Sequence, residues 1–129
     1  MAEPPSEFTI DCDPSTVRYA RSSVRAVLSG TPIADDAALI VSELATNATL
    51  WSASAAPGGT IRVVVSRPAD HIARIEVYDA GPQVPERVDR DAAEDYGRGL
   101  KIVGEYSSRM GHETLDDGRE VWWAELEWT

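Results

Sequence analysis

The spacing of the apolar residues changes near the middle of the chain, and this change restricts the fold more than any other feature. Before the segment "SASAAPGG" the spacing is helical, because apolar residues recur every three or four positions. Asp13 and Pro14 form an N-cap followed by proline at the first helical position, and Gly30 supplies a stop. A second helix is predicted to begin near Asp35 or Asp36 and to run through "AALIVSELATNATLW". The first half of the chain is therefore predicted to be mainly helical.

After this segment the apolar spacing changes to two, which is typical of strands with one buried face. The segments "TIRVVVSRP" and "HIARIEVYD" predict two strands. A terminal hairpin is predicted from "RMGHETL", the turn Asp117-Gly118 and "EVWWAELEW". One face of its last strand carries Trp122, Ala124, Leu126 and Trp128. A short first strand is predicted at residues 8–12, and a third helix is predicted to start within "GRGLKIVGEY".

The predicted elements follow the order β-α-α-β-β-loop-α-β-β, so strands occur in consecutive pairs instead of alternating strictly with helices. This order predicts an α+β fold, a two-layer sandwich in which three helices cover one face of a mixed, mostly antiparallel sheet. We expect a single domain over residues 1–129, with a flexible tail at 1–6 and a long loop at 80–96. Loops of this length in compact domains are either functional lids or disordered.

The composition excludes several classes of function. The formal charge of −10, from 22 acidic and 12 basic residues, opposes binding to a phosphate backbone, so no direct nucleic-acid partner is expected. Cys12 is the single cysteine, which excludes an internal disulfide and a cysteine cluster for zinc. No window approaches the roughly 18 apolar residues of a membrane span, and "MAEPPSEFTID" lacks the regions of a signal peptide. We therefore expect a cytoplasmic protein without membrane contact.

Polar residues interrupt the second predicted helix within "SELATNATLW". Glu43 and Asn47 lie four residues apart and therefore on one face, which continues the stripe of Ile40. In one interpretation this face is the solvent edge of an amphipathic helix. In the other it is a site, with a carboxylate to orient or deprotonate a nucleophile and an amide oxygen to ligate a hard cation such as Mg²⁺.

A second polar feature ends the strand predicted from "HIARIEVYD". Counting back by two places Asp79 on the same face as Val77 and Ile75, so its carboxylate is directed to the apolar side. There it could accept hydrogen bonds from an amino group of a ligand, and Gly81 would let a planar ligand approach the backbone. The alternative is an ordinary turn residue, since "DAGP" is also turn chemistry.

The third feature is "YGRGLKIV", in which Gly97 and Gly99 flank Arg98 at a predicted helix start. Free N–H groups and the helix dipole at such a start form an anion site, and glycine permits close approach. The pattern is neither a Walker A motif nor a dinucleotide fingerprint. The three features occur in an order that is compatible with sites for metal, adenine and triphosphate.

Taken together, these motifs resemble those of the GHKL, or Bergerat-type, ATPases, which include histidine kinases and gyrase B. The chain is most similar to the small stand-alone anti-sigma-factor serine/threonine kinases of bacteria, including actinobacterial regulators. "ELATNATLW" resembles the N box, "DAGP" the first glycine box and "GRGL" the second. The resemblance extends from about Phe8 to Thr129, nearly the whole chain.

The resemblance implies a role for each residue of these boxes. Asn47 would ligate a Mg²⁺ ion that bridges the phosphates of ATP, and Glu43 would act as general base or orient the attacking hydroxyl. Asp79 would accept from the adenine amino group, with Gly81 beside the ring. The second glycine box would close on the phosphates through Gly97, Arg98, Gly99 and Leu100, with residues 80–96 as the ATP lid.

The implied function is transfer of the ATP γ-phosphate to a serine of an anti-anti-sigma (STAS) partner, which controls the availability of a sigma factor. The alternative is a catalytically inactive module that sequesters a sigma factor or STAS protein. Three departures motivate it. Trp51 stands where the N box commonly ends in histidine, and Pro82 and Gln83 follow Gly81 in the first glycine box. The expected lid also carries five acidic residues: Glu86, Asp89, Asp91, Glu94 and Asp95. A third interpretation, part of a larger histidine kinase, is disfavoured because no helix pair with a phosphoacceptor histidine precedes the domain. The sequence leaves open the identity of the partner and whether the chain forms a homodimer.

Overall fold

The structure is a computed structural model that describes residues 4–52, 54, 58–81 and 90–129. For residue 51 and residues 90–97 it describes the backbone but not the side chains. The elements in chain order are β1 (Ser6–Asp11), a 3-10 turn (Pro14–Thr16), α1 (Val17–Val27), α2 (Ala34–Trp51), β2 (Thr60–Ala69), β3 (Ile72–Asp79), α3 (Arg90–Tyr106), β4 (Arg109–Thr114) and β5 (Glu120–Glu127). None of the described helices is both long enough and apolar enough to cross a membrane.

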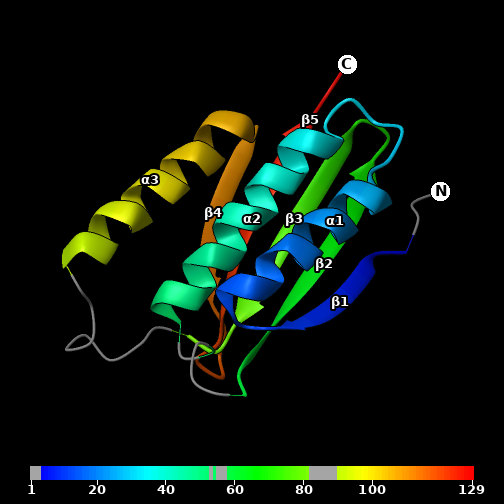
Figure 1. The fold of residues 1–129 in the computed structure, drawn as a ribbon. Helices are drawn as coiled ribbons and strands as arrows, with labels where there is room; N and C mark the ends of the chain where they lie inside the picture. Colours follow the sequence, from blue (N-terminus) through cyan, green and yellow to red (C-terminus); the bar gives the residue numbers. More distant parts are fainter. Residues whose placement is uncertain (1–3, 53, 55–57, 82–89) are drawn as a thin grey trace.

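The five described strands form one sheet in the order β1-β2-β3-β5-β4, and the three helices cover one of its faces (Figure 1). Every described pairing is antiparallel, where we expected a mixed, mostly antiparallel sheet. The predicted α+β two-layer sandwich is confirmed. The central strand β3 lies beneath α2, so residues at its end lie near the helix that carries Glu43 and Asn47.

Local sequence signals account for the helix boundaries. The carboxylate of Asp13 accepts from the backbone N–H of Ser15 at 2.8 Å, which caps the turn that leads into α1. Gly30 has φ +89°, a conformation that favours glycine and ends the helical path before α2. Asp35 and Asp36 lie in the first turn of α2, where negative charge complements the helix dipole.

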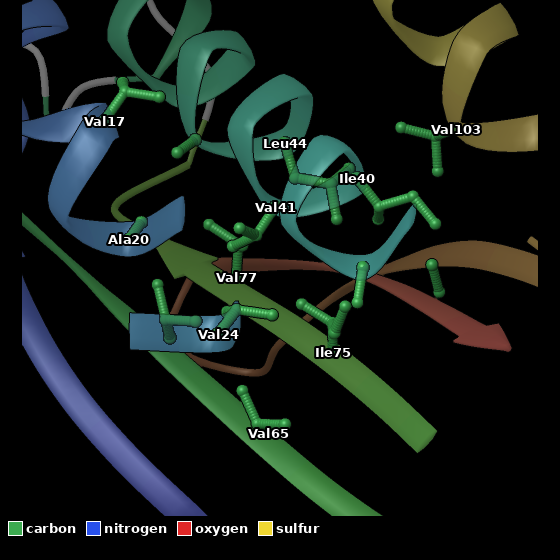
Figure 2. Packing of buried hydrophobic residues seen from close by; sticks show 14 of the residues in the cluster. Val17, Ala20, Val24, Ile40, Val41, Leu44, Val65, Ile75, Val77 and Val103 are labelled. Atoms are coloured by element: carbon green, nitrogen blue, oxygen red, sulfur yellow. The ribbon is translucent and has the colours of Figure 1, made fainter. Parts of the chain in front are cut away.

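The core lies between the helices and the sheet (Figure 2). Ile40, Val41 and Leu44 of α2 are almost fully buried, as are Ile75 and Val77 of β3. Burying side chains of this size stabilises a fold by about 1.5–3 kcal/mol each. The packing fixes the rotation of α2 about its axis, and it thereby determines where the polar residues of this helix lie.

The two neighbouring tryptophans of β5 lie on opposite faces of the sheet, as the alternation of a strand requires. Trp122 packs against the core. Trp123 lies on the other face and is half-buried rather than exposed as we expected, because the Arg74 guanidinium lies 4.3 Å from its ring centroid. Gly111 of β4 lies against the same ring: a Cβ at this glycine would come within 2.6 Å of it.

Two predicted boundaries are wrong. β1 begins at Ser6, inside the segment that we expected to be a tail, because Ser6 pairs with Val65 of β2. Residues 90–96, expected to belong to a long loop, form the first turns of α3. The segment "RDAAEDY" reads as a loop because of its charges, yet alanine and glutamate favour helix and acidic residues suit its N-terminal turns. The rest of the predicted loop, residues 82–89, lies outside the described residues.

Candidate functional site

The polar residues of α2 lie at the boundary between the helix layer and the sheet. Asn47 is 8% exposed, and its Oδ1 is buried without a hydrogen-bond partner among the residues that the structure describes. Leaving such an acceptor unsatisfied costs about 1–3 kcal/mol. The interpretation of this face as a solvent edge is therefore wrong for Asn47. A buried amide oxygen without a partner among the described residues is a candidate contact for a ligand.

Glu43 lies one turn before Asn47 and approaches α3 closely. A Cβ on Gly99 would lie 3.0 Å from Oε2 of Glu43, so the glycine is what gives the carboxylate its space. Desolvation in this half-buried position raises the pKa of Glu43 above its usual value. The structure thus brings the N box and the second glycine box together at one side-chain contact.

The second glycine box does not lie at a helix start, as we predicted. α3 begins at Arg90, so Gly97, Arg98 and Gly99 lie inside the helix. The N–H groups of residues inside a helix donate to the carbonyls four positions earlier, and they are not free donors for an anion. The side chain of Arg98 is exposed, and Leu100 is partly buried against the core. The proposed anion site at a helix N-terminus is therefore not formed at this glycine box.

Asp79 ends β3 on the core face, as the alternation of the strand predicted, and it is only 5% exposed. Its Oδ1 accepts from the backbone N–H of Gly81 at 2.7 Å, and Gly81 has φ +97°. The turn interpretation of the "DAGP" segment is confirmed, because Asp79 stabilises its own turn. Its role as an acceptor for a ligand stays a prediction.

Burial raises the pKa of the Asp79 carboxyl to about 6. The hydrogen bond from Gly81 acts in the opposite direction, while Glu120, which lies directly opposite on β5, raises the pKa further. His112 of β4 lowers the pKa of Asp79. The His112 ring stacks on Trp122 with a centroid distance of 4.3 Å, and its Nε2 lies 3.5 Å from Oε1 of Glu120. A carboxyl group that exchanges its proton near pH 6 can accept a hydrogen bond from a ligand at neutral pH.

Sequence reasoning missed Ser54, which lies at the Asp79 turn, and Ser52, which contacts Ser54. Ser54, in the segment between α2 and β2, is 4% exposed, and its Oγ accepts from the backbone N–H of Ala80 at 2.8 Å. The N–H of Ser54 donates to Oγ of Ser52 at 2.9 Å. A "SASAAPGG" segment is typical of a linker, so neither hydroxyl has a signal in the sequence.

A cavity of about 410 Å³ lies at the ends of β1, β2 and β3. Its lining consists of Thr9, Ser54, Gly58, Gly59, Thr60, Arg62, Tyr78, Asp79, Ala80 and Arg119. Glu43, Asn47 and Gly99 do not line this cavity. Asp79 is therefore the one predicted site residue among the described side chains that line this cavity.

The oxygen atoms of Asn47 and Glu43 suit a magnesium ion that binds together with a ligand, and not one that the protein holds alone. The described residues contain no group of three or more His, Cys, Asp or Glu side chains that could hold a metal ion alone. Mg²⁺ typically takes one or two protein oxygens and completes its shell with water and substrate phosphates. The unpartnered Oδ1 of Asn47 fits this requirement, with the carboxylate of Glu43 one turn away.

Comparisons with known proteins agree with the fold. The family model described as the histidine kinase-like ATPase domain matches residues 10–124. No curated protein matches the chain.

Among solved structures, the crystal structure of the RsbU and RsbW domains of Rv1364c from Mycobacterium tuberculosis is similar, with a TM-score of 0.65 at 21% identity. The similarity covers 97% of this chain but 32% of that chain, and at this identity it shows the fold alone. The family model spans most of the fold and includes every candidate site residue, and the chain therefore belongs to the histidine kinase-like ATPase domain family.

Proposed function

We propose that the chain binds Mg²⁺-ATP on the polar side of α2 and transfers the γ-phosphate to a serine of an anti-anti-sigma (STAS) partner. One observation carries the nucleotide part of this proposal: Asn47 presents a buried oxygen that no described residue satisfies, one turn from a carboxylate that faces the second glycine box. Family membership supports ATP as the ligand. The partner follows only from the resemblance of the three boxes to the anti-sigma-factor kinases.

Each residue has a role that its surroundings support. Asp79 is the buried acceptor for an exocyclic amino group, and Gly81, with its positive φ, forms the turn beside it. The amide oxygen of Asn47 would hold Mg²⁺, which when bound would neutralise phosphate charge. Arg98 and Leu100 flank Gly99 on α3, but phosphate contacts from the N–H groups of residues 97–99 require the start of α3 to open.

In the transfer step, the serine Oγ of the partner forms a bond to the γ-phosphorus while the bond from this phosphorus to the β,γ-bridging oxygen breaks. The serine proton passes to the Glu43 carboxylate, and ADP leaves with the electron pair of the broken bond. The raised pKa of Glu43 suits a group that takes up this proton. Positioning and charge neutralisation supply most of the catalysis in such reactions.

Two measurements test the proposal in sequence. A melting curve with and without millimolar Mg²⁺-ATP tests binding: saturation near 100 times Kd adds about 2.7 kcal/mol to the free energy of unfolding, a shift of several degrees. An unchanged melting temperature would exclude nucleotide binding. Transfer of labelled γ-phosphate to a candidate STAS protein then tests catalysis, and Glu43→Ala is expected to abolish it.

A second function, a binding module without phosphotransfer, is favoured by one observation. The amides of the second glycine box lie inside α3, where they are not free donors for phosphate. In this case the chain would retain a sigma factor or STAS protein equally well with and without ATP, and Asn47→Ala would leave the retention unchanged.

A further inference from the structure

The turn that carries Asp79 is held by a residue from outside the three boxes. Ser54 is 4% exposed and comes from the segment that follows α2. Its Oγ accepts from the N–H of Ala80, the residue between Asp79 and Gly81. The next N–H, that of Gly81, donates to Oδ1 of Asp79. Two consecutive amides of this turn are therefore fixed, one by Ser54 and one by Asp79 itself.

Ser54 is itself held in place by the backbone around it. A Cβ on Gly59 would overlap the carbonyl oxygen of Ser54, so these two backbone segments lie in direct contact. The carbonyl of Gly59 in turn accepts from the N–H of Cys12 at 2.9 Å. Through Gly59, the position of Ser54 is linked to the end of β1.

The opposite side of the turn is closed by the β4–β5 hairpin. A Cβ on Gly81 would come within 2.5 Å of the carbonyl oxygen of Gly118, which itself has φ +88°. The Asp79 turn is thus enclosed between the Ser54 segment and the hairpin. Since Oδ1 of Asp79 is engaged by Gly81, Oδ2 is the carboxylate oxygen that the turn leaves for a ligand.

We propose that Ser54 is a positioning residue for the nucleotide base, which acts by fixing the peptide between Asp79 and Ala80 and thereby the direction of the Asp79 carboxylate. The inference rests on the proposed function, because it assigns Ser54 to the base-binding end of that site. The ligand class is a purine with an exocyclic amino group at the position of adenine N6. A fixed acceptor discriminates such a base from one that carries a carbonyl there, because the wrong base leaves the buried carboxylate without its hydrogen bond.

The test uses Ser54→Ala, Ser54→Thr and a matched control. Ser108→Ala is the control, because Ser108 Oγ also accepts from a backbone N–H, that of Glu127 at 3.0 Å, at the far end of β5. The first measurement is amide hydrogen exchange at Ala80 and Gly81 in the nucleotide-free protein. Ser54→Ala is expected to speed exchange at both amides by about tenfold. Gly81 is included although its N–H donates to Asp79 and not to Ser54. Ser54→Thr, which keeps the hydroxyl, is expected to restore protection.

The second measurement compares the affinities for Mg²⁺-ATP, Mg²⁺-GTP and tripolyphosphate. Ser54→Ala is expected to lower the affinity for Mg²⁺-ATP about fivefold to tenfold, because one hydrogen bond of ordinary net strength is lost. The preference for ATP over GTP is expected to fall by the same factor. Tripolyphosphate, which has no base, is expected to bind all variants equally. Ser108→Ala is expected to match the wild type throughout.

Three results would overturn the inference. Faster exchange at Ala80 alone would show that Ser54 caps one amide without orienting Asp79. An unchanged preference for ATP over GTP would show that Ser54 does not act on base recognition. An equal loss of affinity for ATP and for tripolyphosphate would show a general effect on the fold. If the wild type binds no nucleotide, the proposed function fails separately, and the exchange at Gly81 alone decides whether Ser54 orients the Asp79 turn.

Discussion

Gly99 of α3 faces Glu43 of α2 so closely that a Cβ on the glycine would lie 3.0 Å from the carboxylate Oε2. A glycine inside a helix costs about 1 kcal/mol relative to alanine. The side chain of Glu43 is long, so it can move aside, and the fold itself does not require this glycine. We infer that the glycine keeps the Glu43 carboxylate in its position.

This relationship predicts that Gly99→Ala separates stability from function. We expect the variant to melt at or slightly above the wild-type temperature, because helix propensity rises and a flexible side chain absorbs the contact. Phosphotransfer is expected to fall tenfold or more, because the base is displaced by a few tenths of an ångström and proton transfer depends on geometry. Thermal melting and transfer of labelled phosphate measure the two effects.

Gly104→Ala is the matched control for this prediction. Gly104 lies on the same helix, and its added Cβ would meet Met110 Sδ at 3.6 Å, an ordinary contact. It should gain a similar stability and keep full phosphotransfer. Equal activities of the two variants would show that the contact between Gly99 and Glu43 has no functional role.

Asn47→Ala is expected to remove the magnesium dependence of ATP binding without unfolding the protein. The substitution deletes a buried acceptor that has no described partner, so the loss of packing is offset by removal of an unsatisfied polar atom. ATP affinity measured with Mg²⁺ and with EDTA should differ in the wild type and coincide in the variant. Thr49→Ala on the same helix, whose hydroxyl already donates to the carbonyl of Thr46 at 2.7 Å, should behave like the wild type. A variant that retains the magnesium dependence would remove Asn47 from the metal site.

The sequence was sufficient to predict the layers of the fold and the face on which Asp79 lies, because both follow from the period of the apolar residues. Strand alternation placed Asp79 beside Ile75 and Val77, and the structure confirms it. The start of α3 could not be read, since the charges of residues 90–96 obscure their helix propensity. The contact of Glu43 with Gly99 depends on how α2 and α3 pack, which no local pattern records.

Ser54 shows a different reason why part of a site escapes sequence reasoning. A serine in a segment of small residues and glycines has the composition of a linker, and its hydrogen bond to Ala80 joins residues 26 positions apart. Only the tertiary fold brings the two segments together. Hydrogen bonds between a loop side chain and a distant backbone group carry no periodic signal that could reveal them.

Asp79→Asn is expected to stabilise the nucleotide-free protein at neutral pH. The folded-state pKa of Asp79 is about 6, above the usual 3.8, so its ionisation disfavours the folded state as pH rises. The stability difference between variant and wild type should be near zero at pH 4, grow between pH 4 and 6, and level off at about 3 kcal/mol at most. Asparagine keeps an Oδ1 that can accept from Gly81, so the turn itself is retained. Urea unfolding at several pH values measures the difference.

Asp117→Asn is a control of opposite sign. Asp117 is exposed, and hydrogen bonds from Arg119 lower its pKa, so its ionisation favours the folded state. This variant should lose stability relative to the wild type as pH rises past the folded-state pKa of Asp117 toward its usual value. A difference for Asp79→Asn that shrinks as pH rises from 4 to 6 would contradict the burial of an ionisable carboxyl at this position.

The reactivity of Cys12 is expected to report the charge of Asp79. Burial raises the pKa of the Cys12 thiol to about 11, with further contributions from the negative charges of Asp79 and Asp13. At pH 8 only about one thiol in a thousand is then ionised, and since the thiolate is the nucleophile, alkylation by iodoacetamide should be far slower than in urea. Asp79→Asn should speed the reaction at pH 8, because it removes the larger of the two charge effects, and Asp13→Asn should speed it less. Mass spectrometry of timed samples gives the rates, and equal rates in the wild type and Asp79→Asn would show that the two groups are not electrostatically coupled.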